Sequence, residues 1–289
     1  MTVGGAPTPG ARWPIPGALH TVEVNGYPLA FRDEGAGPPV ILLHGSFNDH
    51  RSWSLLVPVL ATRYRVLAPC LRHYYPERWD GRGGDFSVAQ HAEDVAQFIV
   101  RIGLSNAHVV GHSRGGAVAL TVARRHGDVV RSLVLADPRG LESLLPATVE
   151  AQELAAQLSS SFAEFQRMLA TGDVDAAARG FVDALAGAGS WDRRSPELKQ
   201  VFLDNIGTAG DTGEAPAVER GDIAALRMPL LLVTGARSPR RYGEMFAAMR
   251  GCNAAIAPPV TIPGAAHAMH RDNPQAFSAA LLAFLDRNA

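Results

Sequence analysis

The sequence predicts an α/β fold in which a mostly parallel central sheet carries helices on both faces. Short apolar runs typical of buried parallel strands recur along the chain, and helical patterns separate them. The alternation stops between about residues 141 and 222, where only helical patterns occur. We therefore expect a core formed by residues 19–140 and 223–289, with 141–222 as a helical lid over the carboxyl ends of the strands. The alternative is an ordinary extra layer of helices.

The first half of the chain begins with a hairpin signal, because Asn25-Gly26 separates two strand-like runs. The run 40–43 is short and fully apolar, as expected of a central parallel strand. Apolar residues at helical spacing predict a helix over 88–102. The other elements expected here are strands 21–24, 27–34, 64–68, 107–110 and 132–136, and a helix over 114–126.

The second half returns to the sheet only after the helical segment. Within that segment the best helix candidates are 151–158, 162–169, 175–185 and 196–206. Strands are expected at 230–233 and 260–262, and a final helix at 274–285.

Charge and composition limit the classes of partner. The 289 residues include 27 basic and 28 acidic side chains, which gives no electrostatic reason to expect nucleic acid or an anionic membrane. No apolar run reaches the roughly 18 residues that a transmembrane helix needs. The histidines and cysteines lack metal-ligand spacing and no phosphate-binding loop is present, so we expect neither metal nor cofactor. A homodimer is compatible with this sequence.

The ends and cysteines of the chain indicate a cytoplasmic protein. Residues 1–18 are rich in glycine and proline and lack the apolar centre of a secretory signal, so we expect a flexible extension. Two cysteines, Cys70 and Cys252, do not make a disulfide framework.

The pentapeptide Gly111-His112-Ser113-Arg114-Gly115 indicates a nucleophile. It joins a predicted strand to a predicted helix, and serine in this G-x-S-x-G setting is typical of a nucleophile elbow. We expect strained backbone angles at Ser113, and no room for side chains at Gly111 and Gly115. The following helix directs its N-terminal N–H groups at the same point, which favours developing negative charge.

A serine hydroxyl needs a base, and His267 is the best candidate. It follows a predicted strand, at the sheet edge where Ser113 is expected, and His270 in the same loop is its rival. A carboxylate must then orient the imidazole. Asp137, at the end of strand 132–136, is preferred, because the loop after 230–233 has no carboxylate before Glu244. Glu244, or an acid not recognised in the sequence, is the alternative.

Two backbone N–H groups should hold the oxyanion. We expect them at Arg114, directly after the nucleophile, and at Ser46, in the loop that follows strand 40–43. His44 should orient this loop. The residues expected to contact substrate are His44, Phe47, His112 and Tyr74. Further pocket candidates, for which packing is the competing interpretation, are His73, Tyr75, Phe162, Phe165, Met168, Phe181 and Trp191.

Together these motifs resemble the alpha/beta-hydrolase superfamily. The resemblance rests on Leu42-Leu43-His44-Gly45-Ser46, the elbow with Gly116, Leu133-Val134-Leu135-Ala136-Asp137-Pro138 and Ile262-Pro263-Gly264-Ala265-Ala266-His267, and it runs from about residue 21 to the end. It implies the same nucleophile, base and oxyanion hole.

This sequence departs from the superfamily at the triad acid. Many members carry it after the strand that here ends at Val233, where Ala236-Arg237-Ser238 offers no carboxylate. Haloalkane dehalogenases carry it one strand earlier, which here is Asp137, but they have aspartate where Ser113 stands.

The predicted function is hydrolysis of a carboxylic ester or lactone, a small-molecule acyl substrate, through an acyl-enzyme on Ser113. Superfamily members with the same triad also hydrolyse carbon–carbon bonds of diketones or act as cofactor-free perhydrolases. A receptor-like member that binds a ligand with little turnover is the third hypothesis.

Overall fold

Eight strands form one sheet in the computed structural model, which describes residues 18–145, 148–210 and 216–289. The strands lie side by side in the order β1-β2-β4-β3-β5-β6-β7-β8. Strand β2 pairs antiparallel with β1 and β4, and every other neighbouring pair is parallel. The predicted mostly parallel α/β fold is therefore confirmed. The strands are β1 (His20–Val24), β2 (Tyr27–Glu34), β3 (Pro39–Leu43), β4 (Arg65–Pro69), β5 (Ala107–His112), β6 (Val130–Ala136), β7 (Leu230–Gly235) and β8 (Val260–Ile262).

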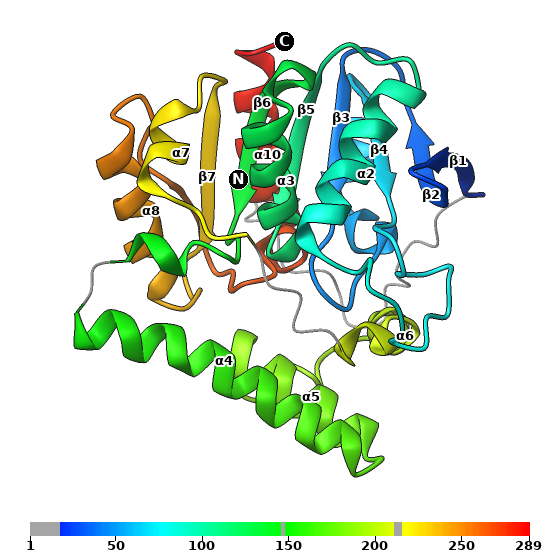
Figure 1. Cartoon of the computed structure of the whole chain (residues 1–289), viewed down its shortest axis with the longest axis vertical. Helices are drawn as coiled ribbons and strands as arrows, with labels where there is room; N and C mark the ends of the chain where they lie inside the picture. Colours follow the sequence, from blue (N-terminus) through cyan, green and yellow to red (C-terminus); the bar gives the residue numbers. More distant parts are fainter. Residues whose placement is uncertain (1–17, 146–147, 211–215) are drawn as a thin grey trace, which may run out of the picture.

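Helices follow most of the parallel strands, as the alternating pattern predicts (Figure 1). The α-helices are α1 (Val57–Leu60), α2 (Val88–Arg101), α3 (Arg114–Arg125), α4 (Val149–Ala170), α5 (Val174–Ala186), α6 (Pro196–Asp204), α7 (Arg220–Ala225), α8 (Arg241–Cys252), α9 (Met269–Asp272) and α10 (Pro274–Asp286). Short 3-10 helices are η1 (His50–Trp53), η2 (Gly127–Val129), η3 (Glu142–Leu144) and η4 (Ile206–Gly210).

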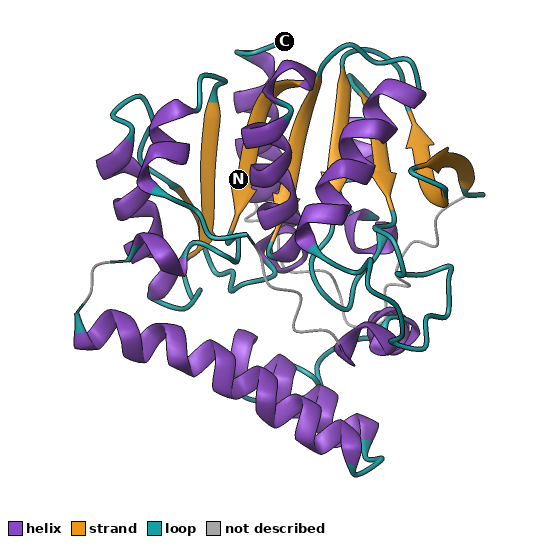
Figure 2. Cartoon of the chain, viewed as in Figure 1, coloured by secondary structure: helices purple, strands orange, loops and turns teal. Residues whose placement is uncertain are grey.

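The two faces of the sheet carry separate hydrophobic cores, as side-chain alternation along a strand requires. In β3, Ile41 and Leu43 pack with the apolar faces of α2, α3 and α8. Val40 and Leu42 pack on the opposite face with α1 and α10. Figure 2 shows the sheet between these helical layers. This double cover explains why the central strands read as uninterrupted apolar runs.

Helices α4, α5 and α6 lie beyond the carboxyl ends of the parallel strands (Figure 1). The prediction of two helices over 151–169 is wrong, because α4 is one helix of 22 residues. The serines at positions 159–161 cost at most about 0.7 kcal/mol each relative to alanine, too little to end a long helix. The division into core and lid stays a prediction.

Two predictions concern the chain ends and the membrane. The expected extension 1–18 lies, apart from residue 18, outside the described residues. Within the part of the chain that is described, no helix combines the length and apolar character needed to cross a membrane.

Candidate active site

Ser113 lies on a tight turn between β5 and α3, with φ 53° and ψ −116°. Its N–H donates to the carbonyl of Ala136, at the end of the neighbouring strand. A Cβ on Gly111 would lie 2.2 Å from the carbonyl oxygen of Gly115, and one on Gly115 would lie 2.2 Å from that of Leu43. No side chain fits at either position, so the predicted strained turn flanked by two obligatory glycines is confirmed.

Asp137 and His267 meet at the same edge of the sheet. Asp137 follows the last residue of β6, and His267 lies in the loop after β8. Nδ1 of His267 lies 3.3 Å from Oδ2 of Asp137. The hydroxyl of Ser238 donates to that same oxygen over 2.6 Å. Asp137 is fully buried, so this carboxylate is held by neighbours and not by water.

Burial sets the protonation of this pair. It lowers the pKa of His267 from 6.5 to about 3, an effect to which the nearby guanidinium of Arg241 adds. Burial raises the pKa of Asp137 from 3.8 to about 7, against the hydrogen bond from Ser238, which lowers it. The imidazole is therefore neutral at neutral pH. With Nδ1–H directed at Asp137, Nε2 carries the lone pair that can accept a proton.

Two neighbouring rings fix the orientation of His267. Nε2–H of His112 donates to the backbone carbonyl of His267 over 2.7 Å. The ring of Tyr242, on α8, stacks on the imidazole at 5.4 Å between centroids and 11° between planes. The first contact holds the backbone of His267 and the second packs against its imidazole, and neither occupies the Nε2 atom.

The competing base and acid lie elsewhere. His270 is buried beside Trp53 and His112, at 4.6 Å between ring centroids in both cases. Glu244 lies on α8, where it forms an ion pair with Arg240 at 3.0 Å on the surface. The structure therefore brings Asp137, and not Glu244, to His267.

The loop after β3 lies directly against the elbow. A Cβ on Gly45 would lie 3.1 Å from Cβ of Ser113, so the glycine permits this approach. His44 is neutral and bridges two backbone groups, since Nδ1–H donates to the carbonyl of Gly45 and Nε2 accepts from the N–H of Leu71. Burial lowers its pKa to about 4. His44 thus shapes the loop that carries Ser46.

The N–H of Arg114 belongs to the first turn of α3, directly after Ser113. The first N–H groups of a helix point out of its N-terminus and carry partial positive charge. The Arg114 side chain points away into the core, where its guanidinium lies 4.3 Å from the ring of Phe86. Only the backbone of Arg114 is therefore placed beside the elbow.

A cavity of about 470 Å³ opens above these groups. Ser113, His267 and Ser46 line it together. Apolar side chains from α4, α5 and α6 line its outer wall, and charged side chains come from loops and from the short helices η3 and α9. The lining residues used below are Asn48, His112, Arg139, Glu142, Phe162, Phe181, Val182, Arg194, Phe202, Tyr242 and Arg271.

Comparison with known proteins identifies the family. The sequence profile described as "Alpha/beta hydrolase family" matches residues 40–280, which is most of the chain. The chain belongs to the alpha/beta hydrolase family. The resemblance seen in the motifs is thereby confirmed.

Individual relatives of this chain differ in their named activities. An uncharacterized protein of Mycobacterium tuberculosis is 32% identical over 44% of this chain, and the match spans only 36% of that relative. A haloalkane dehalogenase of Mycobacterium marinum is 28% identical over 80% of this chain and 83% of its own. The crystal structure of a carboxylesterase from Bacillus subtilis superposes with a TM-score of 0.74 at 17% identity, covering 96% of this chain and 94% of that one. The structural likeness shows the fold, and the family match shows membership of the alpha/beta hydrolase family.

The four residues expected to contact substrate separate into two groups in the structure. His112 lines the cavity. His44, Phe47 and Tyr74 are each buried and do not belong to its lining. Phe47 packs with aromatic rings of the helices outside the sheet, and the Tyr74 ring packs edge-on against His44. Among the further pocket candidates, Phe162 and Phe181 line the cavity.

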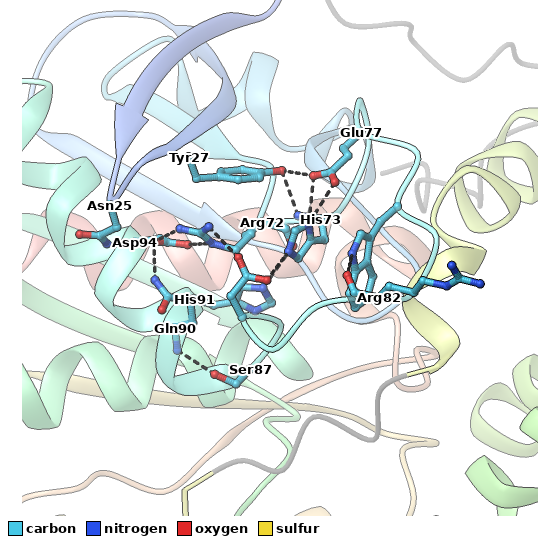
Figure 3. A network of polar contacts seen from close by, with 12 residues as sticks. Asn25, Tyr27, Arg72, His73, Glu77, Arg82, Ser87, Gln90, His91 and Asp94 are labelled. Atoms are coloured by element: carbon cyan, nitrogen blue, oxygen red, sulfur yellow. Dashed lines mark hydrogen bonds and ion pairs between the residues drawn. The ribbon is translucent and has the colours of Figure 1, made fainter.

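A polar network explains why His73 does not face the cavity (Figure 3). Its Nε2 lies 2.8 Å from Asp85, and its Nδ1 lies 3.0 Å from Glu77. The neighbouring Arg72 donates to Asp94 over 2.8 and 2.9 Å and to Asp85 over 2.9 Å. The segment after β4 is therefore held by its own charge pairs.

Several lining residues have no counterpart in the sequence analysis. Arg194 lies in the loop between α5 and α6, and no motif marks it. Arg271 and Tyr242 could have been noticed, since Arg271 follows His267 by four residues and Tyr242 follows the loop that holds Ser238. Their relation to the site emerges only from the folded chain.

Proposed function

We propose that this hydrolase cleaves a carboxylic ester or lactone, with Ser113 as nucleophile, His267 as base and Asp137 as the orienting acid. One observation supports the proposal above all. Ser113, on its strained elbow, lines the same cavity as His267, whose Nδ1 lies 3.3 Å from the buried carboxylate of Asp137. A nucleophile, a neutral base and a fixed tautomer are the groups that acyl transfer needs.

In this mechanism Oγ of Ser113 attacks the carbonyl carbon while Nε2 of His267 accepts the hydroxyl proton. The oxyanion that forms accepts hydrogen bonds from the backbone N–H groups of Ser46 and Arg114. His267 then gives its proton to the leaving alcohol, and the acyl group stays on Ser113. Water, deprotonated by His267, attacks this ester and releases the acid.

The identity of the nucleophile argues for acyl chemistry over the epoxide and haloalkane chemistry named among the relatives. A serine that attacked an epoxide carbon or a haloalkane carbon would form an ether. An ether has no carbonyl that water can attack, so the enzyme would remain alkylated. With a carbonyl substrate, the intermediate on Ser113 is an ester, and turnover can follow.

The helices over the cavity, the free thiols and the size of the cavity are compatible with this proposal. We propose that residues 141–222 act as a lid, because α4, α5 and α6 supply the apolar wall of the cavity. Cys70 and Cys252 are free thiols, as expected in a reducing compartment such as the cytoplasm. The acyl substrate is a small molecule that fits a cavity of about 470 Å³.

Labelling with a fluorophosphonate and turnover of short 4-nitrophenyl esters test the proposal. The wild-type protein should label once and hydrolyse the ester, and Ser113→Ala should lose both properties. Ser143→Ala, an exposed serine outside the cavity lining, is the matched control and should keep both. A diketone and a lactone in the same panel separate ester cleavage from the related carbon–carbon and lactone reactions. Full activity of Ser113→Ala would refute the assignment.

A further inference from the structure

Two arginines give the cavity a cationic side. Arg194 reaches it from the loop between α5 and α6, and Arg271 reaches it from α9, next to the loop of His267. Within the described ranges, neither guanidinium forms an ion pair with a carboxylate. The polar contact of Arg271 is a hydrogen bond of 3.0 Å from its NH1 to the side-chain oxygen of Asn48. Arg194 lies 5.8 Å from the ring of Trp191.

Asp183 and Asp272 lie near these arginines and offset part of their charge, but no described carboxylate forms an ion pair with either guanidinium. Three arginines, including Arg139, line the described part of the cavity against a single carboxylate, Glu142. Asp272 precedes α10 and accepts the N–H of Ala266 over 2.8 Å. Asp183 accepts the backbone N–H groups of residues 189 and 191 over 2.8 Å each. The described lining of the cavity therefore holds more cationic than anionic side chains.

Burial makes this charge costly for the empty protein. It lowers the pKa of Arg194 to about 9, and the positive charge of Arg271 adds to the effect. Burial also lowers the pKa of Arg271, which the nearby Asp272 only partly offsets. A guanidinium nevertheless stays charged at neutral pH in proteins. Both side chains are half-buried, and an anion that enters the cavity offsets the cost of removing their charges from water.

We propose that the substrate is an ester that carries an oxyanion group, a carboxylate or a phosphate, held by Arg194 and Arg271. This inference rests on the proposed function, because it concerns the same cavity. A guanidinium has five N–H donors, so Arg271 can bind an anion while it donates to Asn48. The fork of each guanidinium matches the two oxygens of a carboxylate or phosphate. The apolar part of the substrate then packs against Phe162, Phe181 and Phe202.

Arg271 also connects the anion subsite to the loop of the oxyanion hole. Its NH1 donates to Oδ1 of Asn48, and Nδ2 of Asn48 donates to the carbonyl of Ser46 over 2.8 Å. An anion on Arg271 is therefore two hydrogen bonds away from the loop that contains the Ser46 N–H.

A pair of esters with the same leaving group and acyl length tests the inference. Mono-4-nitrophenyl glutarate carries a carboxylate, and 4-nitrophenyl valerate is its neutral counterpart. The wild-type protein should prefer the glutarate ester in kcat/KM by about tenfold or more, the size expected of charge-assisted hydrogen bonds. Arg194→Leu and Arg271→Leu should lose the preference. Arg193→Leu is the matched control, since this exposed neighbour bonds to Ala188 and Ser190 and should retain it.

Calorimetry on Ser113→Ala gives a readout that does not depend on turnover. Glutarate and inorganic phosphate are the probes, and the tighter of the two identifies the oxyanion. Binding that disappears when Arg194→Leu is added supports the inference, even if no ester is hydrolysed and the proposed function fails. Equal turnover of both esters, together with no binding of either probe, overturns the inference while leaving the ester hydrolase intact. Arg194→Lys keeps the charge and covers the case in which Arg194→Leu does not fold.

Discussion

Ser238 donates a hydrogen bond to Asp137 over 2.6 Å, from the loop after β7 to the end of β6. The loop after β7 is where many superfamily members carry the triad acid, and here it supplies a hydroxyl. The carboxylate is that of Asp137, at the end of the neighbouring strand. Its Oδ2 atom accepts the hydrogen bond from Ser238 and also faces Nδ1 of His267. Ser238 therefore supports a carboxylate that burial alone would keep protonated.

The acid limb of the pH–rate profile should depend on Ser238. Turnover needs the ionised carboxylate of Asp137, whose pKa is raised to about 7, so kcat/KM should rise with pH through this region. Because the hydrogen bond from Ser238 lowers this pKa, Ser238→Ala should shift the limb upward by about one unit. Ser238→Thr keeps the hydroxyl and should restore the profile. An unshifted limb in Ser238→Ala contradicts this role.

Asp137→Asn and Glu244→Gln should separate the two candidate acids. Loss of the carboxylate that orients the base lowers kcat by about four orders of magnitude in a triad, because the wrong imidazole tautomer results. We expect such a loss in Asp137→Asn. Glu244→Gln removes only a surface ion pair with Arg240 and should keep wild-type kcat. Steady-state kinetics on a 4-nitrophenyl ester decide between them, and the opposite pattern would assign the acid to Glu244.

Asp137 should also make stability fall with rising pH. Its pKa is 3.8 in the unfolded chain and about 7 in the folded one, so between these values only the folded state keeps the proton. The free energy of unfolding therefore falls from about pH 4 to about pH 7 and then levels. The free energy of unfolding of Asp137→Asn lacks this slope. Relative to the parent it should increase by a few kcal/mol over this range, on the order of 1.4 kcal/mol per pH unit. Denaturant titrations at several pH values measure it.

Asp286 provides a control of opposite sign for that experiment. A hydrogen bond from Tyr64 lowers the pKa of this surface carboxylate below its value in the unfolded chain. Its contribution to stability is present above pH 3.8 and is lost as the pH falls through its folded pKa. The free energy of unfolding of Asp286→Asn, relative to the parent, should therefore not increase as the pH rises. An increase in the relative stability of Asp286→Asn would show that the Asp137 result reflects the general charge of the protein and not the burial of Asp137.

Gly115→Ala should unfold the elbow, whereas Gly221→Ala should be harmless. A Cβ on Gly115 would overlap the backbone of Leu43 at 2.2 Å, and backbone cannot move aside as a flexible side chain can. The decrease in the free energy of unfolding should exceed the roughly 1–3 kcal/mol that overpacking of side chains costs. Gly221 is exposed on α7 with open space around it, so alanine should stabilise by up to about 1 kcal/mol. Thermal unfolding compares the two, and equal effects would contradict the argument.

Local patterns predicted most of the sheet. Apolar runs such as 40–43 lie within β3, and the Asn25-Gly26 turn joins β1 and β2 as expected. Short elements such as α1 and α9 were not predicted, because four residues carry too little periodicity to be recognised. The helices expected at 151–158 and 162–169 form the single helix α4 instead.

The candidate site was predictable where a motif fixes a position at a strand end. Ser113, His267 and Asp137 follow β5, β8 and β6, and parallel strands bring their carboxyl ends to one edge. The cavity lining was less predictable, because it depends on how the helices after β6 lie over that edge. Phe47 was expected to contact substrate and is buried among Phe165, Phe181 and Phe202 instead.

The left-handed backbone of Phe47 limits how the helices after β6 can be replaced by those of a relative. Its φ of 55° directs the ring, one residue after Ser46, into the aromatic cluster formed with α4, α5 and α6. Replacing residues 141–222 by the corresponding segment of a relative would therefore remove the anchor of the loop that contains Ser46. A chimera that changes specificity should carry a matched residue at position 47 with its new helices. We therefore expect an exchange of these helices without residue 47 to lower activity as well as to change substrate range.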